Sequence, residues 1–265
     1  KSWRRWKAFH PALAEQLLRN FAAPEELISL IEDFESRARE RGFYPNWGPL
    51  VGGLVSSSAT FADAAIERCF APEETALDRV FGAILHHCQT SEQGTKDEWM
   101  ARAVQSPKEE MQKAALWSLR WQDEAPGDLT LEAIRELLGG DRAKSRKLVI
   151  ETLSDAMGSH GSWAVELIGA IPFADIGEDD LKHIAAGMVK GERYGDLRVG
   201  FRELRLILER MVKLESIWDD AYQGLLKIVG RQSPGELYRF IRRRIKTLEE
   251  KLANGEKHPP YSPTP

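Results

Sequence analysis

The sequence predicts an all-α protein in which antiparallel helix pairs stack on one another as the units of an array. The main observation is a helical pattern that returns at intervals of 34 to 35 residues. Pro72 and Pro107 are 35 residues apart, and Ala115 and Val149 are 34 residues apart. A fixed period of this length is typical of stacked helical units, because no single unit can bury its apolar face alone. Elsewhere apolar residues recur at helical spacing, and no segment shows the alternation that is typical of a strand.

The composition of the 265-residue chain limits the classes of function. Hydrophobic residues make up 42% of the sequence and charged residues 29%, which fits a helical protein with a well-solvated surface. The net charge of −4 argues against a surface that is basic throughout and wraps nucleic acid, although it allows a local basic patch. No apolar run reaches the length of a transmembrane helix, so we expect no membrane partner.

Two further features bear on where the protein acts. Cys69 and Cys88 are its two cysteines, too few for a disulfide framework or a zinc site, so a reducing cytoplasm is the simplest location. The chain begins at Lys1 without a methionine or an apolar signal segment. We therefore expect a cytoplasmic protein, of which this chain forms the C-terminal part.

Residues 1–60 are expected to form an N-terminal helical cap. Pro11 favours the first turn of a short helix that ends at Phe21, and Pro24 begins a second helix that ends at Gly42. The second helix carries one apolar stripe, formed by Leu27, Ile28, Ile31 and Phe34. Residues 42–60 are predicted to be an irregular connector rich in glycine and proline. Its apolar residues allow one short helix, and these are Leu50, Val51, Leu54 and Val55.

Residues 61–157 are predicted to form the repeat core. Three helices of the repeating pattern begin at Ala71-Pro72, Ser106-Pro107 and Gly140-Asp141. A partner helix precedes each of them, over residues 61–70, 96–105 and 129–138. Each helix pair is one unit of the array, so we expect Ala115 and Val149 to be buried at equivalent positions.

Residues 158–252 are expected to form C-terminal helical repeats that end in an amphipathic capping helix. The predicted helices cover residues 162–170, 177–189, 197–212, 216–230 and 233–252. One face of the last helix is apolar and should dock on the preceding helix; it comprises Leu237, Phe240, Ile241, Ile245, Leu248 and Leu252. The opposite face is basic and should point outward; it comprises Arg239, Arg242, Arg243 and Lys246. Residues 253–265 are expected to be a disordered, proline-rich tail.

Two segments of the repeat core share a pattern of turn and packing residues. They are Ser106-Pro107 with Ala114, Ala115 and Leu119, and Gly140-Asp141 with Arg146, Val149 and Leu153. This pattern resembles the second helix of HEAT-type repeats, and the resemblance covers residues 61–157. It implies a HEAT-like α-solenoid, here irregular at both ends, with a concave face that binds other macromolecules. On this basis we expect a non-catalytic interaction or scaffold domain.

Residues with catalytic or metal-binding chemistry indicate structural roles in this sequence. No glycine-rich loop is followed by Lys-Ser or Lys-Thr, so a nucleotide-phosphate site is not expected. His86-His87-Cys88 is better explained as a helix end than as a zinc site, because adjacent helical residues point about 100° apart. The acidic residues over 175–180 and at Asp219-Asp220 favour helix starts, where carboxylates complement the helix dipole. We predict no catalytic residue, no metal site and no cofactor.

Two hypotheses for function concern macromolecular partners. The net charge favours the first, in which the domain recognises a protein partner or packs on upstream domains of its own chain. The second is nucleic-acid binding through the basic face of the last helix. Its enzymatic form would resemble the alkylpurine DNA glycosylases, which are built on HEAT-like repeats and use exposed tryptophans. The corresponding residue types here are Trp117 and Trp121, which we interpret as packing between repeats.

A third hypothesis places a pocket for a small molecule in the irregular connector. Phe43, Tyr44 and Trp47 would line that pocket. The preferred explanation of the connector is an apolar segment that packs against the first repeat. The candidate partner-binding residues are therefore these three aromatic residues and the four basic residues of the last helix.

Overall fold

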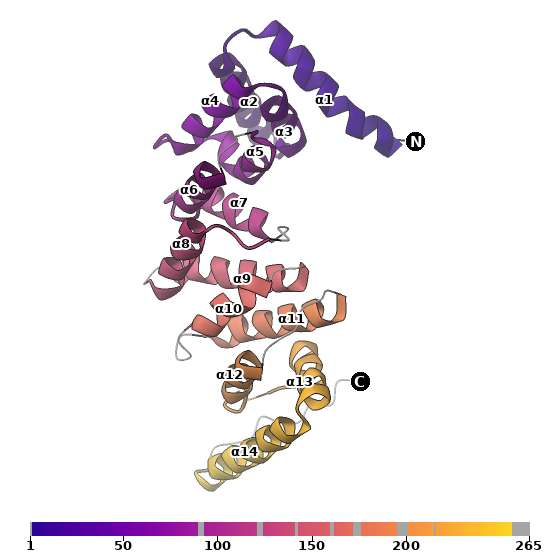
Figure 1. The fold of residues 1–265 in the computed structure, drawn as a ribbon, viewed down its shortest axis with the longest axis vertical. Helices are drawn as coiled ribbons and strands as arrows, with labels where there is room; N and C mark the ends of the chain where they lie inside the picture. Colours follow the sequence, from indigo (N-terminus) through magenta and orange to yellow (C-terminus); the bar gives the residue numbers. More distant parts are fainter. Residues whose placement is uncertain are drawn as a thin grey trace. The chain divides into compact units, whose positions relative to one another are not determined.

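The computed structural model describes residues 2–89, 93–120, 124–140, 143–159, 162–171, 176–194, 201–214 and 216–255. These residues form fourteen α-helices and one 3-10 helix, and no β-strand occurs among them (Figure 1). The all-α fold class is thus confirmed for the described part of the chain. The helices belong to two compact units: unit 1 comprises residues 1–119 and 126–136, and unit 2 comprises residues 120–125 and 137–265.

Unit 1 contains the first seven α-helices, the 3-10 helix η1 and most of the eighth α-helix. Their bounds are α1 Ser2–Asn20, α2 Pro24–Glu40, α3 Gly48–Ser57, α4 Ala59–Phe70, η1 Ala76–Val80, α5 Phe81–His87, α6 Gln93–Val104, α7 Glu109–Leu119 and α8 Asp128–Gly139. Helix α3 contacts both α1 and α5, and α5 also contacts α7. Helix α2 contacts α4. Helices α1, α3, α5 and α7 thus form one run in which alternate helices pack on each other, and α2 packs on α4 in the same way.

Helix α3 forms inside the predicted irregular connector. Its apolar residues Leu50, Val51, Leu54 and Val55 are all buried, so the short helix that the sequence allowed is confirmed. Gly53 brings α3 close to α1, because a Cβ at this position would lie 3.1 Å from the Cβ of Ala14. The small residues of the connector thus serve close helix packing rather than an open loop.

The predicted start of the first helix at Pro11 is wrong. Helix α1 begins at Ser2 and continues through Pro11 to Asn20. A proline inside a helix removes one backbone donor and disfavours the turn before it. In a helix of 19 residues the remaining backbone hydrogen bonds maintain the helix on both sides of that position.

The predicted helix start at Pro72 is also wrong, because residues 71–75 are not helical and η1 begins at Ala76. Thr75 caps η1: its Oγ1 accepts from the Leu77 N–H at 3.3 Å, and its own N–H donates to Asp78 Oδ2 at 2.9 Å. A residue distant in sequence holds the preceding loop, since Lys108 Nζ donates to the Glu73 carbonyl at 3.1 Å. Contacts from a distant segment therefore override the local helix signal of Pro-Glu-Glu.

Unit 2 contains the end of α8 and six further helices. Their bounds are α9 Ala143–Ser159, α10 Ser162–Ala170, α11 Glu178–Tyr194, α12 Phe201–Met211, α13 Asp220–Gln232 and α14 Pro234–Ala253. Helix α11 contacts both α9 and α13, while α12 contacts both α10 and α14. Neighbouring helices α9 and α10, and α13 and α14, also contact each other. Unit 2 thus repeats the packing of alternate helices that unit 1 shows.

The closest helix packing in unit 2 depends on a glycine. A Cβ at Gly187 of α11 would lie 2.2 Å from the carbonyl oxygen of Ser154 on α9. No side chain fits in that space, so the two backbones meet directly.

Val149 on α9 is fully buried, as is Ala115 on α7 of unit 1, which confirms the predicted burial of both residues. Among the described residues, no helix has the length and apolar character needed to cross a membrane.

Candidate interaction surfaces

An exposed aromatic surface lies at the C-terminal end of α2 and on the loop that follows it. We define the aromatic surface as Phe34, Phe43, Tyr44 and Trp47. The first three side chains are 55%, 62% and 69% exposed, and Trp47 is half-buried. The Phe34 and Trp47 rings meet edge to face with centroids 5.5 Å apart. Phe34, predicted from the sequence as part of the apolar stripe of this helix, thus adds an exposed ring that contacts one of the three aromatic residues of the connector.

Backbone contacts hold the loop against α2. The Phe43 N–H donates to the Ala38 carbonyl at 2.9 Å, close to the C-terminal end of the helix. The loop then runs back along α2, because Trp47 contacts Phe34 one turn further toward the N-terminus. Phe34 is exposed because the buried face of α2 is centred on Leu27, Ile31, Glu35 and Ala38, and Phe34 falls at the rim of that face.

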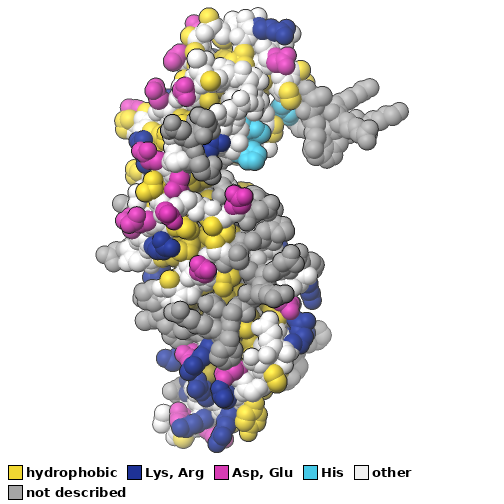
Figure 2. Space-filling model, viewed as in Figure 1, with side chains coloured by type: hydrophobic (Ala, Val, Ile, Leu, Met, Phe, Trp, Pro, Cys, Tyr) yellow, Lys and Arg dark blue, Asp and Glu magenta, His cyan; other side chains and the backbone are white. Residues whose placement is uncertain are grey.

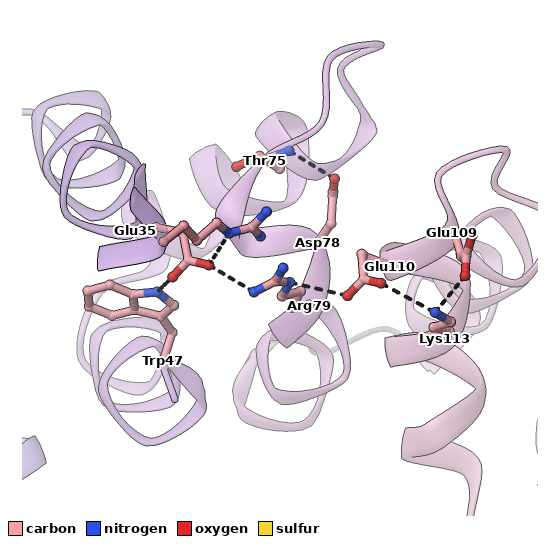
Figure 3. A network of polar contacts seen from close by, with 9 residues as sticks. Glu35, Trp47, Thr75, Asp78, Arg79, Glu109, Glu110 and Lys113 are labelled. Atoms are coloured by element: carbon pink, nitrogen blue, oxygen red, sulfur yellow. Dashed lines mark hydrogen bonds and ion pairs between the residues drawn. The ribbon is translucent and has the colours of Figure 1, made fainter. Parts of the chain in front are cut away.

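Glu35 of α2 holds this loop in place through a hydrogen bond with Trp47. Its carboxylate is almost fully buried and accepts from Trp47 Nε1 at 2.8 Å, Arg39 Nε at 2.7 Å and Arg79 Nη1 at 2.8 Å (Figure 3). The three donors come from the loop, from α2 itself and from η1. A single carboxylate thus ties the aromatic surface to two helical elements, which limits the freedom of the Trp47 ring.

The charges around Glu35 determine its protonation. Burial raises the pKa of Glu35, but hydrogen bonds from Arg39 and Trp47 and the charges of Arg39 and Arg79 outweigh this effect. The pKa of Glu35 therefore lies below its ordinary value, and the carboxylate is ionised at neutral pH. The network continues from Arg79 Nε to Glu110 Oε2 at 3.2 Å, and Glu110 with Glu109 contacts Lys113 on α7 (Figure 3).

The four basic residues predicted as a binding face of α14 are all exposed in unit 2. Figure 2 shows Lys and Arg side chains gathered at the end of the chain where Figure 1 places α14. Three of the four face carboxylates: Arg239 pairs with Glu236, Arg243 lies 3.8 Å from Glu209, and Lys246 lies 3.7 Å from Glu250. This neutralisation weakens the basic face as a site for phosphates.

Arg244 is separated from that basic face by the fold. Its guanidinium donates to the carbonyls of Met211, Val212 and Leu214, at 3.0, 3.3 and 2.8 Å, where α12 ends. Burial lowers the pKa of Arg244 from its ordinary value. The side chain thus satisfies carbonyl groups at a helix C-terminus, where a cation also complements the dipole.

The predicted docking of the apolar face of α14 is largely wrong. Phe240 is the one buried residue of this helix, all of whose residues are described. Ile241, Ile245 and Leu252 are 46–54% exposed and Tyr238 is 66% exposed, while Leu237 and Leu248 are half-buried. The helix is turned so that the side with Phe240 and Arg244 faces its neighbours. Since adjacent residues point about 100° apart, Ile241 is turned toward solvent.

A polar groove of about 920 Å³ in unit 2 brings the acidic start of α11 close to Asp219, which is distant in sequence. Glu178, Asp179 and Asp180 at the start of α11 line it together with Asp219 and Tyr222. Asp219 Oδ2 lies 2.5 Å from Lys182 Nζ, and this hydrogen bond lowers the pKa of Asp219. Asp219 also caps α13 by accepting from the Ala221 N–H at 3.0 Å. No group of three metal-capable side chains is arranged as a site within the described residues.

Two other predicted features have a definite place in the structure. His86 and His87 end α5, and His87 Nδ1 lies 3.3 Å from Ser56 Oγ of α3.

Trp117 is 58% exposed, so its interpretation as a packing residue is wrong. The buried side of α7 carries Met111, Ala115 and Leu119, and Trp117 projects from the opposite side. Trp121, Asp141, Asp175 and residues 256–265 lie outside the described residues.

No known protein family, curated protein or solved structure matches this chain.

Proposed function

We propose that this chain is a protein-binding domain, built as a HEAT-like α-solenoid, that engages its partner through the aromatic surface of unit 1. The alternate-helix packing supports the solenoid arrangement, because α1–α3–α5–α7 and α9–α11–α13 are each a run of successive contacts. Units that contact only their neighbours in this way are typical of repeat arrays. A scaffold of this kind presents exposed residues of its loops and helix ends to other proteins.

The observation that carries the proposal is the exposure of Phe34, Phe43 and Tyr44 on α2 and its following loop, where Trp47 contacts Phe34 and is held by Glu35. Aromatic side chains are enriched among the residues that dominate the binding energy of protein interfaces. A side chain held in place before binding loses less entropy on association than a mobile one. The Glu35 hydrogen bond to Trp47 supplies that constraint.

Nucleic-acid binding is the weaker alternative. The net charge is −4, and three of the four basic residues on the face of α14 already lie against carboxylates. Affinity for nucleic acid rises with the number of phosphates that a protein neutralises. The four-residue face of α14 offers few such contacts, so protein recognition is the better explanation of the exposed surfaces.

Affinity capture with the immobilised chain tests the proposal. We compare the proteins retained from an extract of the source cells by the wild type, by the Phe43→Ala/Tyr44→Ala variant and by the Trp218→Ala variant. Trp218 is the matched control, because it is an exposed aromatic residue in unit 2. Titration of the purified partner then gives Kd for each form.

We expect the double variant to raise Kd at least about thirtyfold, the effect of losing about 2 kcal/mol at one hot spot, and the control to bind like the wild type. Circular dichroism should show unchanged helix content in both variants. Retention of the same partner by the double variant would contradict the proposal. Salt-sensitive retention of nucleic acid that requires Arg242 and Arg243 would favour the alternative instead.

A further inference from the structure

The exposed apolar residues of α14 have the spacing of a coiled-coil seam. Tyr238, Ile241, Ile245, Leu248 and Leu252 follow one another at intervals of three, four, three and four residues. This is the a and d pattern of two heptads. Four of the five side chains are 46–66% exposed, and Leu248 is half-buried. We define these five residues as the α14 stripe.

The two flanks of the α14 stripe differ. One flank carries Arg244 and Lys251 at the g positions, and Arg244 faces the body of unit 2, where it donates to the carbonyls at the end of α12. The other flank carries Arg242 and Glu249 at the e positions, and both are exposed. A second helix can therefore approach the stripe from the e side, where it meets one basic and one acidic residue.

We propose that the α14 stripe packs antiparallel against the α14 stripe of a second copy of this chain. In an antiparallel helix pair, e positions face e positions. A twofold axis between Ile245 and Leu248 then places Arg242 of each copy beside Glu249 of the other, which gives two equivalent ion pairs. A twofold interface of this type closes on itself, because both copies use the same surface.

The opposite orientation uses the charges less well. In a parallel pair Glu249 would face Arg244 of the second copy, whose guanidinium already donates to three carbonyls. Arg242 would face the g position at Leu237, which offers no charge. The antiparallel arrangement therefore pairs the two exposed charges at the e positions of the α14 stripe. The inference does not rest on the aromatic surface, which belongs to unit 1.

The small area of this interface limits the affinity that we expect for the dimer. A seam of two heptads lies below the roughly 800 Å² per partner of a standard interface, so we expect a reversible dimer with Kd on the order of 10 μM. Sedimentation velocity of the wild-type chain from about 1 to about 200 μM should show a monomer that converts to a dimer. A chain that remains monomeric throughout this range would overturn the proposal.

Variants of the stripe and its flank identify the interface. Ile241→Ser/Ile245→Ser should raise the dimer Kd at least tenfold while the circular dichroism spectrum and Tm stay near those of the wild type. Arg242→Glu should weaken the dimer, and Arg242→Glu/Glu249→Arg should restore it, because the double exchange reverses both antiparallel ion pairs. The matched control is Arg239→Glu, which changes an exposed arginine away from the stripe and should leave Kd unchanged.

Three outcomes would overturn the antiparallel pair. A dimer that the isoleucine double variant leaves intact would locate the interface elsewhere. Failure of Arg242→Glu/Glu249→Arg to restore the dimer would exclude the antiparallel pair. In a parallel pair this variant is expected to weaken the dimer, because it places an arginine at position 249 opposite Arg244 of the second copy. Binding of the monomer to vesicles of anionic phospholipid, lost in Ile241→Ser/Ile245→Ser, would instead identify α14 as a membrane-surface helix.

Discussion

Lys108 Nζ lies 2.9 Å from Asp78 Oδ1, and this ion pair is almost wholly removed from solvent, with the two side chains 9% and 1% exposed. Burial raises the pKa of Asp78, while hydrogen bonds from Lys108 and the Thr75 backbone oppose that rise. Lys108 also donates to the Glu73 carbonyl, so it ties the loop before η1 to the segment that precedes α7. The pair therefore links the turn that begins η1 to the turn that begins α7, which are successive repeat-like segments of unit 1.

Removing one member of this pair should be more harmful than removing both. Lys108→Met leaves a buried carboxylate without its counter-charge, and we expect a loss of about 3–5 kcal/mol in the free energy of unfolding. Adding Asp78→Asn should recover part of that loss, because the amide oxygen can still accept from Thr75. Urea unfolding of the two single variants and the double variant gives the coupling energy, expected to be about 1–3 kcal/mol. Additive losses would show that the ion pair contributes nothing of its own.

Glu35→Gln should loosen the support of the aromatic surface. The amide keeps an acceptor for Trp47 but removes the charge that faces Arg39 and Arg79, which are partly exposed. We expect a cost of about 2–3 kcal/mol, below the range for a fully buried pair. Glu40→Gln, on an exposed residue of the same helix, is the control and should change stability by no more than about 0.5 kcal/mol. Equal effects of the two variants in urea unfolding would contradict the role assigned to Glu35.

The same carboxylate predicts a dependence on acid. The pKa of Glu35 in the folded protein lies below the ordinary value of 4.5, so the unfolded chain binds the proton first as the pH falls. The stabilising contribution is thus fully present above 4.5 and is lost as the pH falls through the lowered folded value. The difference in unfolding free energy between wild type and Glu35→Gln should therefore shrink below pH 4.5. A difference that stays constant with pH would show that Glu35 does not titrate in this way.

His87 should make unit 1 less stable in mild acid. Burial and, to a smaller degree, the neighbouring His86 lower the pKa of His87 below its ordinary 6.5. The unfolded state therefore takes up the proton first, and stability is lost as the pH falls from 6.5 through the lowered folded value. We expect urea midpoints that fall between about pH 7.5 and about pH 5.5, with a smaller change in His87→Gln. Parallel pH profiles for the two proteins would remove His87 as the cause.

Gly187→Ala should destabilise unit 2 by separating α9 from α11. The added methyl group would lie 2.2 Å from the Ser154 carbonyl oxygen, so one helix backbone has to move, at a cost of about 1–3 kcal/mol. Gly139→Ala is the matched control in a helical glycine of unit 2, since no atom lies within 4 Å of the added Cβ. It should be neutral or stabilising by up to about 1 kcal/mol. Thermal unfolding that ranks the two variants in the reverse order would show that α9 and α11 do not pack this closely.

Features that depend on local patterns can be predicted from the sequence. Apolar spacing predicted the helices, including α10 over residues 162–170 and the apolar residues of α3. The 34-residue offset also identified Ala115 and Val149 as buried positions. These predictions succeed because helix formation and the choice of an apolar side follow from residues within a few turns of one another. The exposed aromatic residues 43 and 44 were likewise visible as candidates before their surroundings were known.

How much of each apolar face is covered depends on tertiary packing. Periodicity identifies the apolar side of a helix, but the neighbouring helices determine which part of that side they bury. Phe34 and Ile241 therefore lie exposed at the rims of faces whose centres are occupied by Ile31 and Phe240. The same reason applies to the polar contacts: Glu35 with Arg79 and Asp78 with Lys108 join residues 44 and 30 positions apart. Such pairs have no local signature, because the energy of bringing them together comes from the packing of the whole unit.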